Sequence, residues 1–231
     1  MGHHSIQQGL ESVHRLMDLA LDAAKRPRGS VSLVAVSKTQ PPKAIREAFG
    51  YGQIHFGENY LQEALSKQEA LRDVEDIIWH FIGPIQSNKT RQIAERFSWV
   101  HGIDRLKIAE RLNDQRPPAM GPLNVCIQVN ISEEYSKSGV KPDEVAALAQ
   151  QIEQLPHLKL RGLMGIPEVP DGMYEPRMAF RALRQLKEAL LPIPLDTLSM
   201  GMSLDFESAI LEGATMIRVG SRIFGARDGA V

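Results

Sequence analysis

Lys38 stands one residue beyond a short apolar run rich in β-branched residues, residues 31–36, with Ser37 between them. Such a run is typical of a strand buried on both faces of a parallel sheet. Because α/β folds place their chemistry at the carboxyl ends of such strands, a lysine here can form a Schiff base if its surroundings lower its pKa. The alternative is that Lys38 only marks the point where the strand reaches the surface.

Polar residues also follow the other apolar runs. In chain order they are Asn59, His80, Asp104, Asn130, the segment 199–203 and the segment 218–221. If parallel strands close into a barrel, the residues just after each strand form one mouth. Because polar groups gathered around a cavity need a ligand to satisfy them, this pattern indicates a binding site.

Two loops near the end of the chain, residues 199–203 and Gly220-Ser221, have the composition of a phosphate site. Barrel enzymes commonly bind phosphate after their seventh and eighth strands, on backbone N–H groups and a helix N-terminus. Gly201 and Gly220 let the backbone approach a ligand closely, and Ser203 and Ser221 offer hydroxyl donors. Either loop alone is equally typical of an ordinary N-cap or turn, so it is their joint occurrence that favours phosphate.

A lysine after the first strand and a phosphate site after the last two would face each other across the mouth. Pyridoxal 5′-phosphate needs that pair, an amine for its aldehyde and an anion site for its phosphate. Its ring nitrogen needs a partner as well, and Arg218, near the end of the last strand, is placed for it. The alternative for Arg218 is an ion pair inside the barrel.

The rest of the chain supplies elements that would hold these residues. Strand-like runs, each with a helical pattern after it except the last, occupy residues 31–37, 53–56, 77–82, 99–103, 123–130, 158–166, 196–200 and 215–219. An apolar stripe at three- and four-residue spacing predicts a further helix over 5–26. This unbroken series favours an α/β fold, a single (β/α)8 TIM barrel domain over residues 1–231 with an extra N-terminal helix, over a doubly wound sheet.

The composition narrows the partners and the compartment. The formal net charge of −1 gives no basic excess to hold nucleic acid or an anionic membrane. No apolar run approaches the roughly 20 residues of a membrane span, and the N-terminus lacks the pattern of a signal peptide. A single cysteine, Cys126, fits a reducing cytoplasm. His80 and His101 have no third ligand at metal spacing, so we expect hydrogen-bonded barrel histidines and no metal.

Seven segments carry a resemblance to a known family. They are Leu33-Val34-Ala35-Val36-Ser37-Lys38, Phe56-Gly57-Glu58-Asn59-Tyr60, Trp79-His80-Phe81-Ile82-Gly83, Gln86-Ser87-Asn88-Lys89, Ser136-Lys137-Ser138-Gly139, Leu198-Ser199-Met200-Gly201-Met202-Ser203 and Phe224-Gly225-Ala226-Arg227. Together they closely resemble the pyridoxal phosphate homeostasis protein family, over nearly the whole chain. The resemblance implies a barrel like the N-terminal domain of bacterial alanine racemase and of eukaryotic ornithine decarboxylase.

The resemblance also implies roles for particular residues. Lys38 would hold pyridoxal 5′-phosphate as an internal aldimine, Ser203, Gly220 and Ser221 would take the phosphate, and Arg218 would take the ring nitrogen. Residue 221 is serine where the family more often has threonine, but both carry the hydroxyl. We further expect four residues in the cofactor site: Asn59, His80, Ser199 and Met202.

Two residues have alternative roles. Asn59 either orients the lysine or bonds the cofactor, or it caps the following helix. Lys137, in the polar loop after the run 123–130, either accepts the cofactor transiently during its transfer or is a solvated loop lysine.

Three functions fit these expectations. The first is a protein that holds the cofactor for intracellular vitamin B6 homeostasis, by buffering it or delivering it to apoenzymes that depend on it, without robust catalysis. The second is a racemase-like enzyme acting on an amino acid with Lys38 as base. The third is a barrel enzyme for another sugar or amine phosphate.

We favour the first function for two reasons. An arginine at the ring nitrogen cannot give up its proton, which weakens the ring as an electron sink. The barrel is also expected to use all 231 residues. Racemases of this fold take a second base, typically a tyrosine, from another domain, and that domain also makes them dimers. Without it we expect a monomer.

Overall fold

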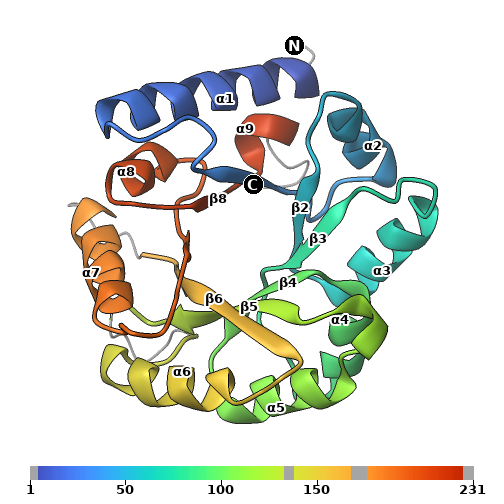
Figure 1. Ribbon diagram of the computed structural model, residues 1–231. Coiled ribbons are helices and arrows are strands. Elements are labelled where there is room, and N and C mark those ends of the chain that lie inside the picture. The colour runs from blue at the N-terminus through green and yellow to red at the C-terminus, as the bar shows by residue number, and fades with distance from the viewer. Residues whose placement is uncertain (1–4, 133–137, 168–175, 226–231) are drawn as a thin grey trace.

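The computed structural model describes residues 5–132, 138–167 and 176–225. Parallel strands pair in chain order and close into a barrel, with helices around the outside (Figure 1). The strands are β1 (Ser32–Val36), β2 (His55–Glu58), β3 (Ile78–Phe81), β4 (Trp99–Ile103), β5 (Leu123–Val129), β6 (Leu158–Gly165), β7 (Thr197–Ser199) and β8 (Met216–Val219). The predicted (β/α)8 barrel with an extra N-terminal helix is confirmed.

Helices α2 to α8 lie between consecutive strands, as the alternating pattern predicts, while α1 precedes the first strand and α9 follows the last. They are α1 (Ile6–Ala23), α2 (Pro42–Gly50), α3 (Leu61–Ala70), α4 (Thr90–Arg96), α5 (Leu106–Gln115), α6 (Val145–Glu153), α7 (Pro176–Glu188), α8 (Phe206–Leu211) and α9 (Ser221–Phe224), with 3₁₀ turns η1 (Ser87–Lys89), η2 (Pro118–Met120) and η3 (Pro142–Glu144). In the described part of the chain, no helix is long and apolar enough to span a membrane.

The second strand differs most from its prediction. It was expected over 53–56 but spans His55–Glu58. Gln53 lies before the strand, and its side-chain amide donates to the carbonyls of Leu33 and His55, at 2.7 and 2.6 Å. At the other end the strand continues through Glu58, whose carboxylate is fully buried. A charged residue is tolerated there because it has buried hydrogen-bond donors, described below.

The N-terminal helix α1 packs outside the barrel against two later helices. It starts at the Ser5 cap, whose hydroxyl accepts from the N–H of Gln8. It lies beside α8 and α9 (Figure 1). Just after it, Arg26 donates to the carbonyls of Ile210 and Ala214, at 2.8 Å each. The N-terminal segment is therefore fixed to the last two helices of the described chain.

Gly9 sets the distance between α1 and α9. A Cβ atom at this position would lie 2.6 Å from the carbonyl oxygen of Arg222 and 2.8 Å from that of Ile223. We expect Gly9→Ala to destabilise the protein by about 1–3 kcal/mol in urea unfolding, as overpacking does. The exposed neighbour Gln8→Ala is the control. A stabilised Gly9→Ala protein would contradict the close packing, because alanine alone favours a helix by about 1 kcal/mol.

Candidate functional site

A pocket of about 310 Å³ opens at the carboxyl ends of the strands. Seven of the predicted cofactor residues line it together: Lys38, Asn59, Met202, Ser203, Arg218, Gly220 and Ser221. The other two, His80 and Ser199, are fully buried inside the barrel and do not line the pocket. Lys137 lies outside the described residues.

The backbone before Lys38 is held by two side chains from the next unit of the barrel. The Ser37 carbonyl accepts from Nζ of Lys67 at 2.7 Å, and its hydroxyl donates to Oε1 of Glu58 at 2.8 Å. Lys67 Nζ also contacts Glu58 Oε1 at 2.8 Å, and both side chains are buried. This buried ion pair therefore anchors the residue that precedes the lysine.

The backbone after Lys38 is held in the same way. Thr39 has a φ of 67°, a left-handed conformation that is uncommon outside glycine. Its N–H donates to Oε1 of Glu63 at 2.5 Å. Glu63 is in turn paired with Lys67. The ion-pair cluster of Glu58, Glu63 and Lys67 thus holds the backbone on both sides of Lys38. It thereby fixes the position from which the lysine side chain extends.

Reasoning from the sequence missed this cluster, although one signal was present. Lys67 falls on the same stripe of α3 as Leu61 and Ala64, at intervals of three residues. A solvated lysine has no reason to occupy a buried stripe. Burial raises the pKa of Glu58, and the hydrogen bond and charge of Lys67 oppose that rise.

Asn59 follows this cluster and faces the pocket. The cap of α3 is Tyr60, so the alternative role of Asn59 as a helix cap is wrong. Its Oδ1 atom is buried and has no hydrogen-bond partner within the described residues. Buried polar atoms in folded proteins are almost always paired. An unpaired acceptor on the pocket wall therefore indicates a ligand donor.

The two glycine- and serine-rich loops line the same pocket beside the end of β1, because β1 pairs with β8 and a Cβ atom on Gly220 would lie 3.1 Å from the Val36 carbonyl oxygen. The prediction that Lys38 and these loops face each other across the mouth is therefore wrong. Gly201 has a φ of 99°, and a Cβ atom there would lie 2.6 Å from that of Ala209. The first loop therefore requires glycine. Nε of Arg222, in α9, donates to the Ser203 carbonyl at 2.6 Å and links the two loops. Ser221 is the first residue of α9.

Arg218 is buried between the pocket and the barrel interior. Its Nη1 donates to Oγ of Ser199 at 2.6 Å and its Nη2 to the Gly165 carbonyl at 3.2 Å. Within the described residues these hydrogen bonds go to neutral acceptors and not to a carboxylate. Burial lowers the pKa of Arg218 to about 10, so the guanidinium stays charged at neutral pH.

Behind Arg218, hydrogen bonds continue through three histidines. Ser199 Oγ lies 2.8 Å from Nδ1 of His101, His101 Nε2 lies 2.9 Å from Nδ1 of His80, and His80 Nε2 lies 2.9 Å from Nδ1 of His55. The prediction of hydrogen-bonded barrel histidines is confirmed for His80 and His101. Burial lowers the pKa of His101 to about 3 and that of His80 well below its usual value, so both rings are neutral.

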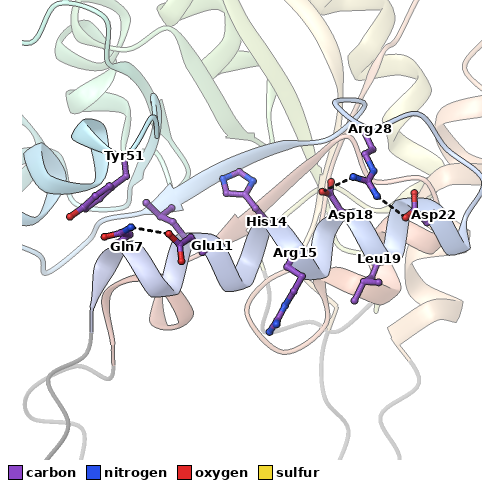
Figure 2. A pocket seen from close by; sticks show the side chains of 10 residues that line it. Gln7, Glu11, His14, Arg15, Asp18, Leu19, Asp22, Arg28 and Tyr51 are labelled. Atoms are coloured by element: carbon purple, nitrogen blue, oxygen red, sulfur yellow. Dashed lines mark hydrogen bonds and ion pairs between the residues drawn. The ribbon is translucent and has the colours of Figure 1, made fainter.

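Other candidate sites on the molecule are weaker. A wider cavity of about 580 Å³ lies on the outer face of α1, beside Tyr51 (Figure 2). Three of its charged side chains pair with one another, since Arg28 bonds both Asp18 and Asp22 at 3.4 and 3.0 Å. It shares no residue with the strand-end pocket. Among the described residues, no group of His, Cys, Asp or Glu could hold a metal.

Comparison with known proteins gives the class to which this barrel belongs. The family model for the alanine racemase N-terminal domain matches residues 20–228. Alanine racemase from Corynebacterium glutamicum has the same fold, with a TM-score of 0.65 at 20% identity, and 96% of this chain covers 62% of that one.

More similar proteins narrow the class to a family. A pyridoxal phosphate homeostasis protein of Pseudomonas aeruginosa is 55% identical over 97% of this chain and 96% of its own length. The protein of the same name from Escherichia coli K12 is 48% identical over 97% and 98%. The structure of PipY from Synechococcus elongatus with PLP bound has a TM-score of 0.83 at 38% identity, covering 96% of this chain and all of that one. The chain belongs to the pyridoxal phosphate homeostasis protein family.

Proposed function

We propose that this protein binds pyridoxal 5′-phosphate through Lys38 and serves intracellular vitamin B6 homeostasis by buffering or delivering the cofactor, without robust turnover. The observation that carries the proposal is the single pocket that joins Lys38 to Ser203, Gly220, Ser221 and Arg218. The names of the relatives and the PLP-bound structure of PipY support it. We propose further that it acts in the cytoplasm as a monomer and passes the cofactor to apoenzymes that depend on it.

The side chains present fit the chemistry of this cofactor. When bound, pyridoxal 5′-phosphate supplies an aldehyde that condenses with an amine and an aromatic ring that withdraws electrons. Lys38 supplies the amine, and Ser203 and Ser221 supply hydroxyl donors beside backbone that can approach a phosphate. Arg218 would donate to the ring nitrogen, and the unpaired Oδ1 atom of Asn59 would accept from a donor on the ligand.

The charge of Arg218 favours a carrier over an enzyme. Because a guanidinium donates a hydrogen bond but keeps its proton, it would leave the pyridine nitrogen unprotonated and limit the stabilisation of carbanions on the ring. The relatives that match this chain over nearly their whole length are named as homeostasis proteins. A racemase-like activity on amino acids is the second candidate, favoured by the fold shared with alanine racemase.

The decisive experiment compares Lys38→Ala with Lys43→Ala, an exposed lysine on the neighbouring helix α2. Each protein is incubated with pyridoxal 5′-phosphate, its visible absorbance is recorded, and borohydride reduction is followed by mass mapping of peptides. We expect a yellow adduct on the Lys38 peptide in wild type and Lys43→Ala, and none at that site in Lys38→Ala. An adduct spread over surface lysines would overturn the proposal.

A second assay separates carrier from enzyme. The loaded protein is incubated with single-enantiomer amino acids, and loss of optical activity is followed. We expect no sustained turnover by wild type. Steady racemisation by wild type that disappears in Lys38→Ala would establish the racemase-like alternative.

A further inference from the structure

The hydrogen-bonded chain behind Arg218 crosses the barrel interior from β8 to β2. It runs from Arg218 to Ser199 on β7, then to His101 on β4, His80 on β3 and His55 on β2. All of these side chains are fully buried except those of Arg218, which is 4% exposed, and His55, which is partly exposed. The indole of Trp99 stacks on His80, with ring centroids 5.5 Å apart. This series of hydrogen bonds therefore links the pocket to the outside through the centre of the fold.

The chemistry of arginine determines which atom donates in each hydrogen bond of this series. Guanidinium has only donors, so Ser199 Oγ must accept from Arg218. The described residues offer the Ser199 hydroxyl one other partner, Nδ1 of His101, so Ser199 donates to that nitrogen. A neutral imidazole that accepts at Nδ1 carries its proton on Nε2. His101 then donates from Nε2 to His80, and His80 donates from Nε2 to His55 in the same way.

A chain with this direction stabilises the charge of Arg218. Every donor points away from the guanidinium, so the negative end of each dipole points toward it. Buried charges are costly unless they are paired or hydrogen-bonded, and hydrogen bonds in series strengthen one another. This series of hydrogen bonds therefore gives the guanidinium neutral acceptors. The charge of Asp205, which also lines the pocket, adds to their effect, because it opposes the lowering of the Arg218 pKa by burial.

We propose that Ser199, His101, His80 and His55 form a positioning relay that keeps Arg218 charged and aimed at an uncharged aromatic nitrogen of the ligand. A carboxylate partner would draw the guanidinium N–H groups toward itself and would favour a protonated ring nitrogen. Within the described residues, Arg218 donates instead to Ser199 and to the Gly165 carbonyl, both neutral, while it lines the pocket. The identity of that ligand as pyridoxal 5′-phosphate rests on the proposed function, whereas the direction of the relay does not.

The direction can be tested without any ligand. Histidine is labelled with ¹⁵N, and the tautomer of each ring is read by long-range ¹H–¹⁵N NMR at neutral pH, with His→Gln variants for assignment. We expect His55, His80 and His101 all to carry the proton on Nε2. Ser199→Ala should remove this constraint from His101, whereas exposed His14→Gln should leave the relay signals unchanged. A proton on Nδ1 of His80 or His101 in wild type would overturn the inference.

The effect on the ligand is tested with three proteins. Wild type, Ser199→Ala and Ser199→Thr are titrated with pyridoxal 5′-phosphate, and the pH midpoint of the bound cofactor's absorbance is measured. We expect Ser199→Ala to bind about 10-fold more weakly, as loss of one charge-assisted hydrogen bond implies, and to shift the midpoint. Ser199→Thr, which keeps the hydroxyl, should restore both. Equal behaviour of the alanine and threonine variants would contradict the relay.

The test of the proposed function and the test of the relay can fail independently of each other. If wild type forms no adduct at Lys38, the proposed function is wrong, but the tautomers can still follow the relay. If the adduct forms and the tautomers run in the opposite direction, the relay is wrong and the cofactor site stands.

Discussion

Lys67→Met is expected to destabilise the folded protein by about 3–5 kcal/mol, the usual effect of removing one partner of a buried ion pair. Lys67 is 4% exposed and Glu58 is not exposed at all. Methionine preserves the length and apolar stem of the lysine, so the loss of charge is the main change. Glu58 would then keep a buried carboxylate without its cation. The free energy of unfolding in urea at pH 7 measures the effect.

Two controls separate charge from packing. The pair Arg46–Asp73 is about half exposed on both sides, so Asp73→Asn should change stability by no more than about 1 kcal/mol. The double variant Glu58→Gln with Lys67→Met removes both charges, and it should be more stable than Lys67→Met alone. If Lys67→Met unfolds within 1 kcal/mol of wild type, or if the double variant recovers nothing, the ion pair does not hold this loop.

The same variant has a pH signature. Burial already raises the pKa of Glu58, and without Lys67 this pKa rises further. A group whose pKa is raised by folding contributes stability at low pH and loses it as the pH rises through the folded pKa. The destabilisation of Lys67→Met relative to wild type should therefore be smaller at pH 5.5 than at pH 8.

Lowering the pH from 7 to 5 is expected to reduce the free energy of unfolding by about 2 kcal/mol through His101 alone. Burial lowers the pKa of this histidine from about 6.5 in the unfolded chain to about 3 in the folded protein. Between these values the unfolded chain binds the extra proton, so stability falls as the pH decreases below 6.5. His80 adds to the effect in the same direction.

Urea unfolding at pH 5, 6 and 7 gives the slope. His101→Gln should reduce it, because the unfolded chain then has one fewer proton to gain. His14→Gln, on the exposed face of α1, should leave it unchanged. An identical slope in wild type and His101→Gln would show that this ring does not stay neutral in the folded protein.

The barrel could be predicted from sequence because each strand is a nearly continuous apolar run that ends at a polar residue. The same pattern placed Lys38, Ser203 and Arg218 at one mouth, since the strand ends of a barrel converge by topology alone. Glu58 was the exception. A carboxylate looked like the end of strand 53–56, and only its contacts with Ser37 and Lys67 let it remain in β2.

The histidine relay could not have been predicted in the same way, because it depends on register. His80 pairs with Gly57 on β2 and with Trp99 on β4. His55 lies two positions before Gly57, and His101 lies two positions after Trp99. The three rings therefore follow the stagger of the barrel diagonally. A slip of one residue in any of these pairings would turn a ring to the other face of the sheet. Sequence periodicity does not determine the pairing to that accuracy.

The pairing of β1 with β8 has a consequence for synthesis of the protein. Contacts at this seam join residues very far apart in the chain, such as the bonds of Arg26 across 184 and 188 positions. At a translation rate of about 5–20 residues per second, Lys38 leaves the ribosome roughly 10–40 s before the strand that completes its pocket. Through that interval the nascent chain carries Lys38 without the loops of the proposed phosphate site. We therefore expect cofactor loading to follow the synthesis of β8.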